Sequence, residues 1–160
     1  MNAPDAGVDT DLRRITTAQV SRIAPSPTNP RKHFDAAAIA ELTASVLQHG
    51  VLQPILLRPW PADYAYQGSR PTFEIVAGER RWRAAKAANV AWINVVVRDL
   101  STREVLEMQI VENLQRADLH PLEEAEGYAR MAQEHGYTVE DLAEKISKSK
   151  AYIYARMKLV

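Results

Sequence analysis

The segment from Gly78 to Ala84 places three arginines directly after a glycine, in a pattern that suits a phosphorylated ligand. The apolar run Phe73 to Ala77 precedes the glycine and an alanine-rich run follows it, so the sequence predicts a strand, a turn and a helix. Gly78 can adopt backbone angles closed to other residues and lets a ligand approach the main chain. The amides after it belong to a helix N-terminus, which attracts anions.

The arginines strengthen this interpretation because their charge opposes the helix dipole, and a bound anion would remove the conflict. Arg80 and Arg83 share one helix face, whereas Arg81 points elsewhere. Guanidinium forks and backbone amides together could bind a polyphosphate. The alternative is a solvated basic helix start whose arginine stems cover apolar surface, and the residues alone leave both readings open.

A second group of polar residues ends the helix that carries Val105, Met108 and Val111. A carboxylate and an amide, Glu112 and Asn113, offer the oxygen ligands that Mg²⁺ prefers, and Mg²⁺ commonly bridges to substrate phosphates. The group is completed by Gln115 and Arg116. The alternative is a polar helix C-terminus in which Arg116 compensates the dipole.

The last third of the chain predicts a helix-turn-helix. Thr138 and Asp141 cap a helix over 139–146, a short turn spans 147–149, and a second helix begins at Ala151. Ile153, Met157 and Val160 form its apolar stripe. Five cations outnumber two anions within 141–160, which suits a DNA major groove, although an ordinary helical hairpin stays open. The residues predicted to contact DNA are Lys148, Ser149, Lys150, Tyr152 and Arg156.

Other elements must position these groups. We expect a short strand over 15–23, a rigid loop with three prolines over 24–31, and a helix from Asp35 to Gly50. The apolar face of that helix is expected to comprise Ile39, Leu42, Val46 and Leu47. Residues 51–58 predict a strand, and Pro54 inside it indicates an edge strand or a bulge. A long loop or hairpin extension over 59–71 follows.

Later elements are marked by their caps. Residues 92–98 predict a strand, and Ser101 with Glu104 predicts a capping box. A further helix is expected from Pro121 to Gly136. His120 and His135 flank it, and we expect each to be a cap or surface histidine rather than a metal ligand.

Composition narrows the function classes. The 160 residues carry 20 basic and 20 acidic side chains, so DNA contact requires a local basic patch. The chain has no cysteine, which excludes disulfides, thiolate metal sites and cysteine nucleophiles and fits a reducing cytoplasm. No apolar run reaches membrane-spanning length. Residues 1–14 are expected to form a disordered arm.

The order of three stretches resembles the ParB family of plasmid and chromosome partition proteins, including KorB-like regulators. The stretches are 25–34, 78–84 and 112–125, and the resemblance covers about residues 15–160. It implies an α/β N-terminal domain with a small mixed sheet, followed by an all-helical helix-turn-helix region. The expected division is an arm over 1–14, a nucleotide-binding domain over 15–100, connecting helices over 101–136 and a helix-turn-helix over 137–160.

The resemblance implies a weak CTP hydrolase that binds CTP with Mg²⁺ and a palindromic, centromere-like DNA site. Nucleotide and DNA would close a homodimer into a sliding clamp, and slow hydrolysis would help to reopen it. A ParA-type ATPase would engage the N-terminal arm, and the protein would be cytoplasmic and associated with a nucleoid or plasmid. No membrane partner is implied.

The resemblance also assigns roles to residues. It makes Glu112 and Asn113 the metal-binding and hydrolytic pair. The nucleotide-binding residues carried over are Thr28, Asn29, Arg31, Gly78, Glu79, Arg80, Arg81, Glu112, Asn113, Gln115 and Arg116. The family usually has glutamine where this chain has Asn29, and the segment over 59–71 is longer than usual.

Other readings differ in what they require. A helix-turn-helix regulator that binds nucleotide without hydrolysing it, or binds none, stays open. Sulfiredoxin-like enzymes need a cysteine that this chain lacks, and no acidic and histidine cluster supports a nuclease. Because Val160 falls within the second helix and no dimerisation domain follows, we expect the chain to be a truncated part of a longer protein. A single nucleotide site requires Glu79, Asn113 and the loop at Asn29–Arg31 to face one cleft.

Overall fold

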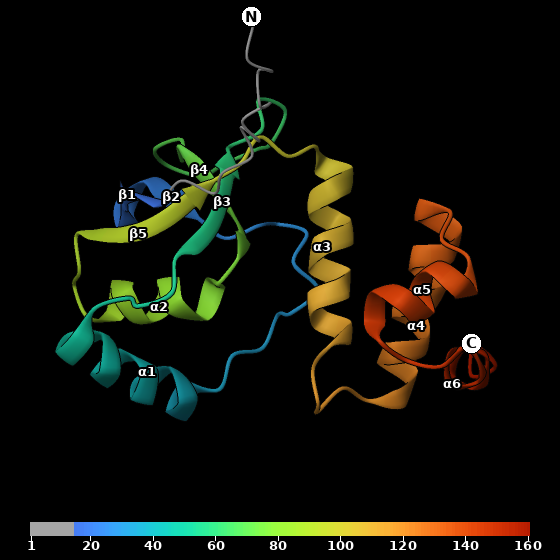
Figure 1. Cartoon of the computed structure of the whole chain (residues 1–160). Helices are drawn as coiled ribbons and strands as arrows, with labels where there is room; N and C mark the ends of the chain where they lie inside the picture. The colour runs from blue at the N-terminus through green and yellow to red at the C-terminus, as the bar shows by residue number, and fades with distance from the viewer. Residues whose placement is uncertain (1–14) are drawn as a thin grey trace, which may run out of the picture. The chain divides into compact units, whose positions relative to one another are not determined.

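The computed structural model describes residues 15–160, which form two compact units (Figure 1). The first unit contains the residues up to Ala24 together with Leu42–Arg98, and the second contains Pro25–Glu41 together with Asp99–Val160. The predicted arm over 1–14 lies outside the described residues. Within the described part, no helix is both long and apolar enough to cross a membrane.

The first unit is built on one five-stranded sheet in the order β1-β5-β3-β4-β2. β1 pairs with β5 and β3 with β4 in antiparallel fashion, whereas β5 with β3 and β4 with β2 are parallel. The sheet is therefore mixed, as predicted. The strand bounds are β1 Ile15–Gln19, β2 Ile23–Ala24, β3 Ile55–Pro59, β4 Phe73–Ala77 and β5 Trp92–Val97, and a short 3-10 helix, η1 Val20–Arg22, joins the first two.

Helix α2 (Glu79–Ala87) packs against this sheet (Figure 1). Trp82, Ala84 and Ala85 are buried among side chains of the central strands, including Leu57 and Val95. Trp82 also donates its indole N–H to the carbonyl of Val20 at 3.2 Å. The alanine-rich run after the arginines is therefore the core-facing side of a short helix.

Two sequence predictions in this unit are only partly right. β3 lies between β5 and β4, so it is not an edge strand. Pro54 precedes the strand, where its missing N–H costs no ladder hydrogen bond. The predicted alternative, a bulge, agrees with the register shift between Leu56 and Leu57. On α1 (Ala36–His49), Val46 is buried but Leu47 is 67% exposed, because successive helix residues are rotated by about 100° from one another.

The ends of α1 agree with the sequence. The Asp35 carboxylate accepts a hydrogen bond from the amide of Ala37 at 3.0 Å, and the helix ends before Gly50. The loop over 60–72 joins β3 to its antiparallel neighbour β4, which makes the predicted hairpin extension. α1 begins in the second unit and ends in the first.

The second unit is helical over 99–160. Its helices are α3 Thr102–Leu114, α4 Pro121–His135, α5 Val139–Ile146 and α6 Lys150–Met157. They enclose an apolar core that comprises Ile110, Leu114, Tyr128, Met131, Leu142, Ile146 and Ile153. Capping boxes at Ser101 with Glu104 and at Thr138 with Asp141 begin α3 and α5, as predicted.

Two further predictions fail here. α6 ends at Met157, and Val160 is 59% exposed, so the expected apolar stripe stops one turn earlier. His120 caps α4 through Nδ1, but His135 is buried rather than at the surface, because the last turn of α4 packs its ring near Glu107 on α3. The α/β fold followed by a helical region is confirmed.

Candidate functional site

In the first unit, the glycine turn before α2 has the geometry that the sequence predicts. Gly78 is the N-cap of α2 with a φ of 102°, in the left-handed region that favours glycine. A Cβ at this position would lie 2.9 Å from the guanidinium of Arg81, so the space beside the turn is already filled by that side chain. The turn thus places the N–H groups of a helix start beside the guanidinium of Arg81.

The three arginines of this turn have different surroundings. Arg81 donates to the carbonyls of Gln53 and Pro54 at 2.9 and 2.6 Å, which ties α2 to the loop before β3. Arg83 pairs with the buried Glu79 at 3.2 Å. Arg80 is exposed. Of the three guanidinium groups, Arg80 is therefore the one that an anion can reach with the least rearrangement.

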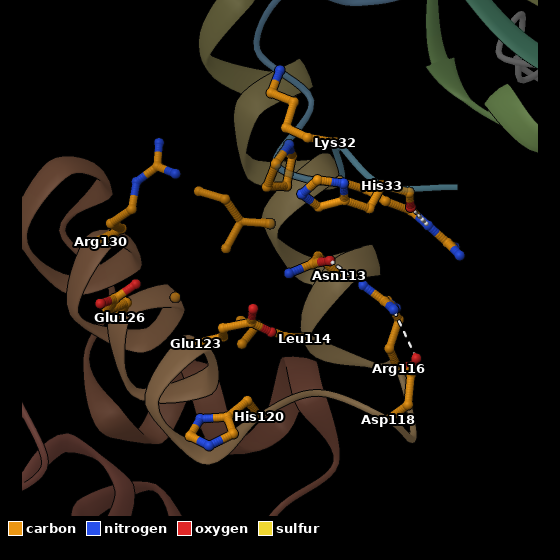
Figure 2. Close-up of a pocket in the computed structure, with 14 residues that line it drawn as sticks. Lys32, His33, Asn113, Leu114, Arg116, Asp118, His120, Glu123, Glu126 and Arg130 are labelled. Atoms are coloured by element: carbon orange, nitrogen blue, oxygen red, sulfur yellow. Dashed lines mark hydrogen bonds and ion pairs between the residues drawn. The ribbon is translucent and has the colours of Figure 1, made fainter. Parts of the chain in front are cut away.

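The second unit contains a cavity of about 520 Å³ (Figure 2). Three segments form its walls: the loop over 30–33, the end of α3, and the first turns of α4 with the residues before it. The lining residues are Pro30, Arg31, Lys32, His33, Ile110, Asn113, Leu114, Arg116, Asp118, His120, Glu123, Glu126, Gly127 and Arg130. The cavity brings together three of the predicted nucleotide-binding residues, Arg31, Asn113 and Arg116.

The proline loop beside this cavity is held in place by hydrogen bonds. The Oδ1 atom of Asn29 accepts from the amide of Arg31 at 3.0 Å, which closes a local turn. The hydroxyl of Thr28 donates to Oε1 of Gln109 on α3 at 3.0 Å and also contacts Ser26. The predicted residues Thr28 and Asn29 thus fix the loop that carries Arg31.

At the end of α3, Arg116 connects two acceptors. It donates to Oδ1 of Asn113 at 3.4 Å and to the carboxylate of Asp118 at 2.8 Å (Figure 2). The hydrogen bond from Arg116 lowers the pKa of the Asp118 carboxyl. Because the bond to Asn113 is long, its amide oxygen can turn to another partner at little cost.

Glu112 and Gln115 are exposed and do not line the cavity. The helical rotation between neighbours separates the side chain of Glu112 from that of Asn113. The oxygens of Glu112 and Asn113 still fit Mg²⁺, since an exposed carboxylate and an adjacent amide oxygen are hard ligands. Two protein ligands are enough, because Mg²⁺ takes its other ligands from water and phosphate oxygens.

Sequence reasoning missed the α4 side of the cavity. Glu123, Glu126 and Arg130 line it from successive turns, together with Lys32 from the loop (Figure 2). Their spacing of three and four residues was a usable signal, because such residues share a helix face. Gly127 brings α4 close to α3, since a Cβ there would lie 2.7 Å from Leu114.

The residues predicted to bind DNA divide into two groups. Lys148, Ser149 and Lys150 are exposed at the turn and the start of α6, where Ser149 caps the helix by accepting from the amide of Tyr152 at 3.1 Å. Lys150 pairs with Glu140 at 2.8 Å. Tyr152 and Arg156 are partly buried and both bond to Glu124 of α4.

Two family models together match most of this chain. The ParB N-terminal domain matches residues 5–114, and the ParB HTH domain matches residues 117–160. This chain belongs to the ParB family. Stage 0 sporulation protein J of Bacillus subtilis is 41% identical over 160 residues, which is all of this chain and 54% of that relative. A probable chromosome-partitioning protein ParB of Rickettsia bellii is 38% identical over 148 residues, or 92% of this chain and 47% of the relative.

Solved structures of ParB extend the comparison. C-terminally truncated ParB from Caulobacter crescentus in complex with the centromeric parS site has a TM-score of 0.76 at 38% identity and covers 90% of this chain and 71% of its own. The same protein in complex with CTP-γ-S has a TM-score of 0.57 at 38% identity and covers 91% of this chain and 78% of its own. This ParB chain spans about half the length of the ParB relatives named above.

Proposed function

We propose that this ParB chain takes part in DNA segregation by binding a centromere-like DNA site and by using CTP to gate a dimeric clamp on that DNA. The observation that carries the proposal is the pair of Caulobacter crescentus complexes, one with parS and one with a CTP analogue. Both cover at least 90% of this chain at 38% identity. Nearly all residues of this chain therefore have counterparts in a protein whose structure is known in complex with each ligand.

In this proposal the nucleotide is bound by residues at the start of α2 and around the cavity. The helix start at Gly78 to Arg81 offers backbone amides and the exposed Arg80, and the cavity of the second unit offers Arg31, Asn113 and Arg116. Charge-assisted hydrogen bonds from arginine are strong and match phosphate geometry. The residues proposed to bind nucleotide are Thr28, Asn29, Arg31, Gly78, Glu79, Arg80, Arg81, Glu112, Asn113, Gln115 and Arg116.

Slow hydrolysis is assigned to the end of α3. Glu112 and Asn113 are the residues that would hold Mg²⁺, and when bound the ion would neutralise charge on phosphate oxygens. Asn113 lines the cavity and its amide oxygen has only a long hydrogen bond to Arg116 to give up. Glu112 is exposed at the adjacent position and can approach a phosphate-bound ion from solvent.

DNA recognition is assigned to α5 and α6. Lys148 and Lys150 supply positive charge and Ser149 supplies a hydroxyl at the start of the second helix of the helix-turn-helix. We further propose that the protein acts as a homodimer in the cytoplasm, associated with a nucleoid or plasmid. The segment over 1–14 would engage a ParA-type ATPase.

Nucleotide titration tests the proposal. We expect CTP to bind more tightly than ATP, GTP or UTP in calorimetry, and a duplex carrying parS of the Caulobacter relative to increase phosphate release from CTP. A scrambled duplex is the control. Equal affinity for all four nucleotides, or no binding of any, would contradict CTP gating. CTP binding without phosphate release would favour a regulator that does not hydrolyse nucleotide.

A further inference from the structure

Helix α4 carries a buried carboxylate that binds two side chains of α6. Glu124 is 6% exposed, and its Oε2 atom accepts from the hydroxyl of Tyr152 at 3.0 Å and from Nε of Arg156 at 2.9 Å. Its Oε1 atom accepts from the hydroxyl of Tyr128 at 2.7 Å. One carboxylate therefore receives three donors, two of which come from the second helix of the helix-turn-helix.

The contacts around Glu124 reinforce one another. The guanidinium of Arg156 lies 4.9 Å from the ring centroid of Tyr152, so the two α6 side chains also stack. Hydrogen bonds to Tyr152 and Glu124 raise the pKa of Arg156, and burial with the bond to Glu124 raises that of Tyr128. Removing the charge of Arg156 would leave the buried carboxylate without its cation, which is costly.

The opposite side of α6 is open to solvent. Ile153 is fully buried and Tyr152, Arg156 and Met157 are partly buried, so these residues mark the face toward the core and α4. Tyr154 is 53% exposed. The exposed residues recur at helical spacing and form a stripe that comprises Lys150, Ala151, Tyr154, Ala155 and Lys158.

We propose that Glu124 is a positioning residue for DNA recognition, which holds Tyr152 and Arg156 against α4 so that Tyr154 and its stripe meet the DNA groove. The inference rests on the proposed DNA-binding function. It reassigns Tyr152 and Arg156, which sequence reasoning placed on the DNA, to the support of α6. It also names Tyr154, which sequence reasoning did not select.

The chemistry of the stripe suits a groove. Lys150 and Lys158 lie two turns apart and can contact phosphates on either side of Tyr154. Ala151 and Ala155 leave room for the helix to approach base edges, and an alanine methyl can contact the methyl group of thymine. The phenol of Tyr154 supplies a hydroxyl for hydrogen bonds and a ring for apolar contact.

The first test replaces the side chain of Tyr154 in the 160-residue chain. Fluorescence anisotropy would give the affinity for a duplex carrying parS of the Caulobacter relative and for a scrambled duplex, at low salt. We expect Tyr154→Ala to reduce the ratio of the two affinities about tenfold, the loss typical of one good base contact, without changing the unfolding temperature. The matched control is Tyr66→Ala, because Tyr66 is 49% exposed in the other unit.

The second test separates positioning from contact. Arg156→Met should lower the specific affinity, and the double variant Glu124→Gln with Arg156→Met should restore it, because it removes the buried charge together with its partner. The salt dependence of binding should stay that of the wild type in the double variant. If Arg156 instead touched a phosphate, the log–log slope would fall by about one and binding would not recover.

These results distinguish the inference from the function on which it rests. A wild-type chain that prefers parS, with Tyr154→Ala unchanged or with the double variant folded but not rescued, overturns the positioning role alone. A wild-type chain that binds both duplexes equally overturns the proposed DNA recognition and this inference with it. Circular dichroism of each variant confirms that the compared proteins are folded.

Discussion

At the scale of single residues, Arg81 shows that hydrogen bonds within the protein can decide the role of a side chain in a ligand-binding motif. Its guanidinium binds the carbonyls of Gln53 and Pro54, so in this conformation the side chain holds two segments of the first unit together. Arg80, one position earlier, is exposed. Two neighbouring arginines in one motif therefore have different tasks, one structural and one suited to a ligand.

Replacement of Gly78 should affect both stability and binding. A serine at φ 102° is strained by about 1–2 kcal/mol, and its Cβ would displace the Arg81 guanidinium. We expect Gly78→Ser to remain folded with a lower unfolding temperature and to lose most of its triphosphate affinity. Calorimetry and thermal unfolding would measure the two effects. Gly68→Ser is the control, since Gly68 also has positive φ but open space around it. Retained CTP affinity would contradict the proposed role of the Gly78 turn in nucleotide binding.

Asn113 offers a way to separate nucleotide binding from turnover. If its amide oxygen helps to hold Mg²⁺, Asn113→Ser should slow phosphate release from CTP at least tenfold, because the shorter hydroxyl cannot reproduce the ligand geometry, while thermal unfolding changes little. Release would be measured with CTP and parS duplex. Asn94→Ser is a matched control, because Asn94 is exposed on β5. Wild-type turnover in Asn113→Ser would rule out that role.

At the scale of elements, the helix caps and strand pairs explain why the two units fold as they do. Capping boxes fix the starts of α3 and α5, and the buried pair of Arg58 and Glu74 links neighbouring positions on β3 and β4. Tyr64, from the loop between these strands, also contacts Arg58. The long β3–β4 loop is therefore held to the sheet by the contact of Tyr64 with the buried Arg58.

Breaking the Arg58–Glu74 pair should strongly destabilise the first unit. Both side chains are almost fully buried, so Arg58→Met removes a cation from beside a buried carboxylate and should cost about 3–5 kcal/mol in urea unfolding. The double variant Arg58→Met with Glu74→Leu is the control and should recover most of that loss, since an apolar pair removes the buried charge. A loss below 1 kcal/mol in the single variant would contradict this account of the strand pair.

The cap of α5 should make the stability of the folded protein depend on pH. Hydrogen bonds from the Thr138 hydroxyl and then from its amide lower the pKa of the Asp141 carboxyl in the folded state below its ordinary value of 3.8. The stabilisation is therefore complete above pH 3.8 and is lost as the pH falls through the lower folded pKa. The difference in the free energy of unfolding between wild type and Asp141→Ala should become smaller at acid pH. In a Thr138→Val background this difference should depend less on pH. A difference that does not change with pH in the wild-type background would argue against the cap.

Sequence patterns were sufficient for elements whose signal is local. The Thr138 and Ser101 boxes, the strand over 73–77 and the glycine turn at Gly78 each depend on neighbouring residues, and all were predicted correctly. The edge-strand alternative at Pro54 and the surface position of His135 were wrong because strand order and helix packing decide their surroundings. The spacing of Glu123, Glu126 and Arg130 along α4 was a local signal that the prediction did not use. The Glu124 network joins residues far apart in sequence, which no local pattern reveals.

At the scale of the whole molecule, each unit contributes groups that suit an anionic ligand. The first unit contributes a helix start with an exposed arginine, and the second contributes a cavity lined by Arg31, Asn113 and Arg116. A nucleotide can shift a conformational equilibrium only through contacts that differ between the two conformations. The same second unit carries the helix-turn-helix, so nucleotide and DNA could be coupled.

The most direct test is the CTP affinity of single variants from each unit. Arg80→Ala in the first unit and Arg31→Ala in the second should each weaken CTP binding in calorimetry by about tenfold to a hundredfold, the loss expected for one hydrogen bond to a charged group. Arg22→Ala, at an exposed arginine of the first unit, should bind CTP like the wild type. If either Arg80→Ala or Arg31→Ala keeps wild-type affinity in a folded protein, the proposed role of that arginine in CTP binding is contradicted.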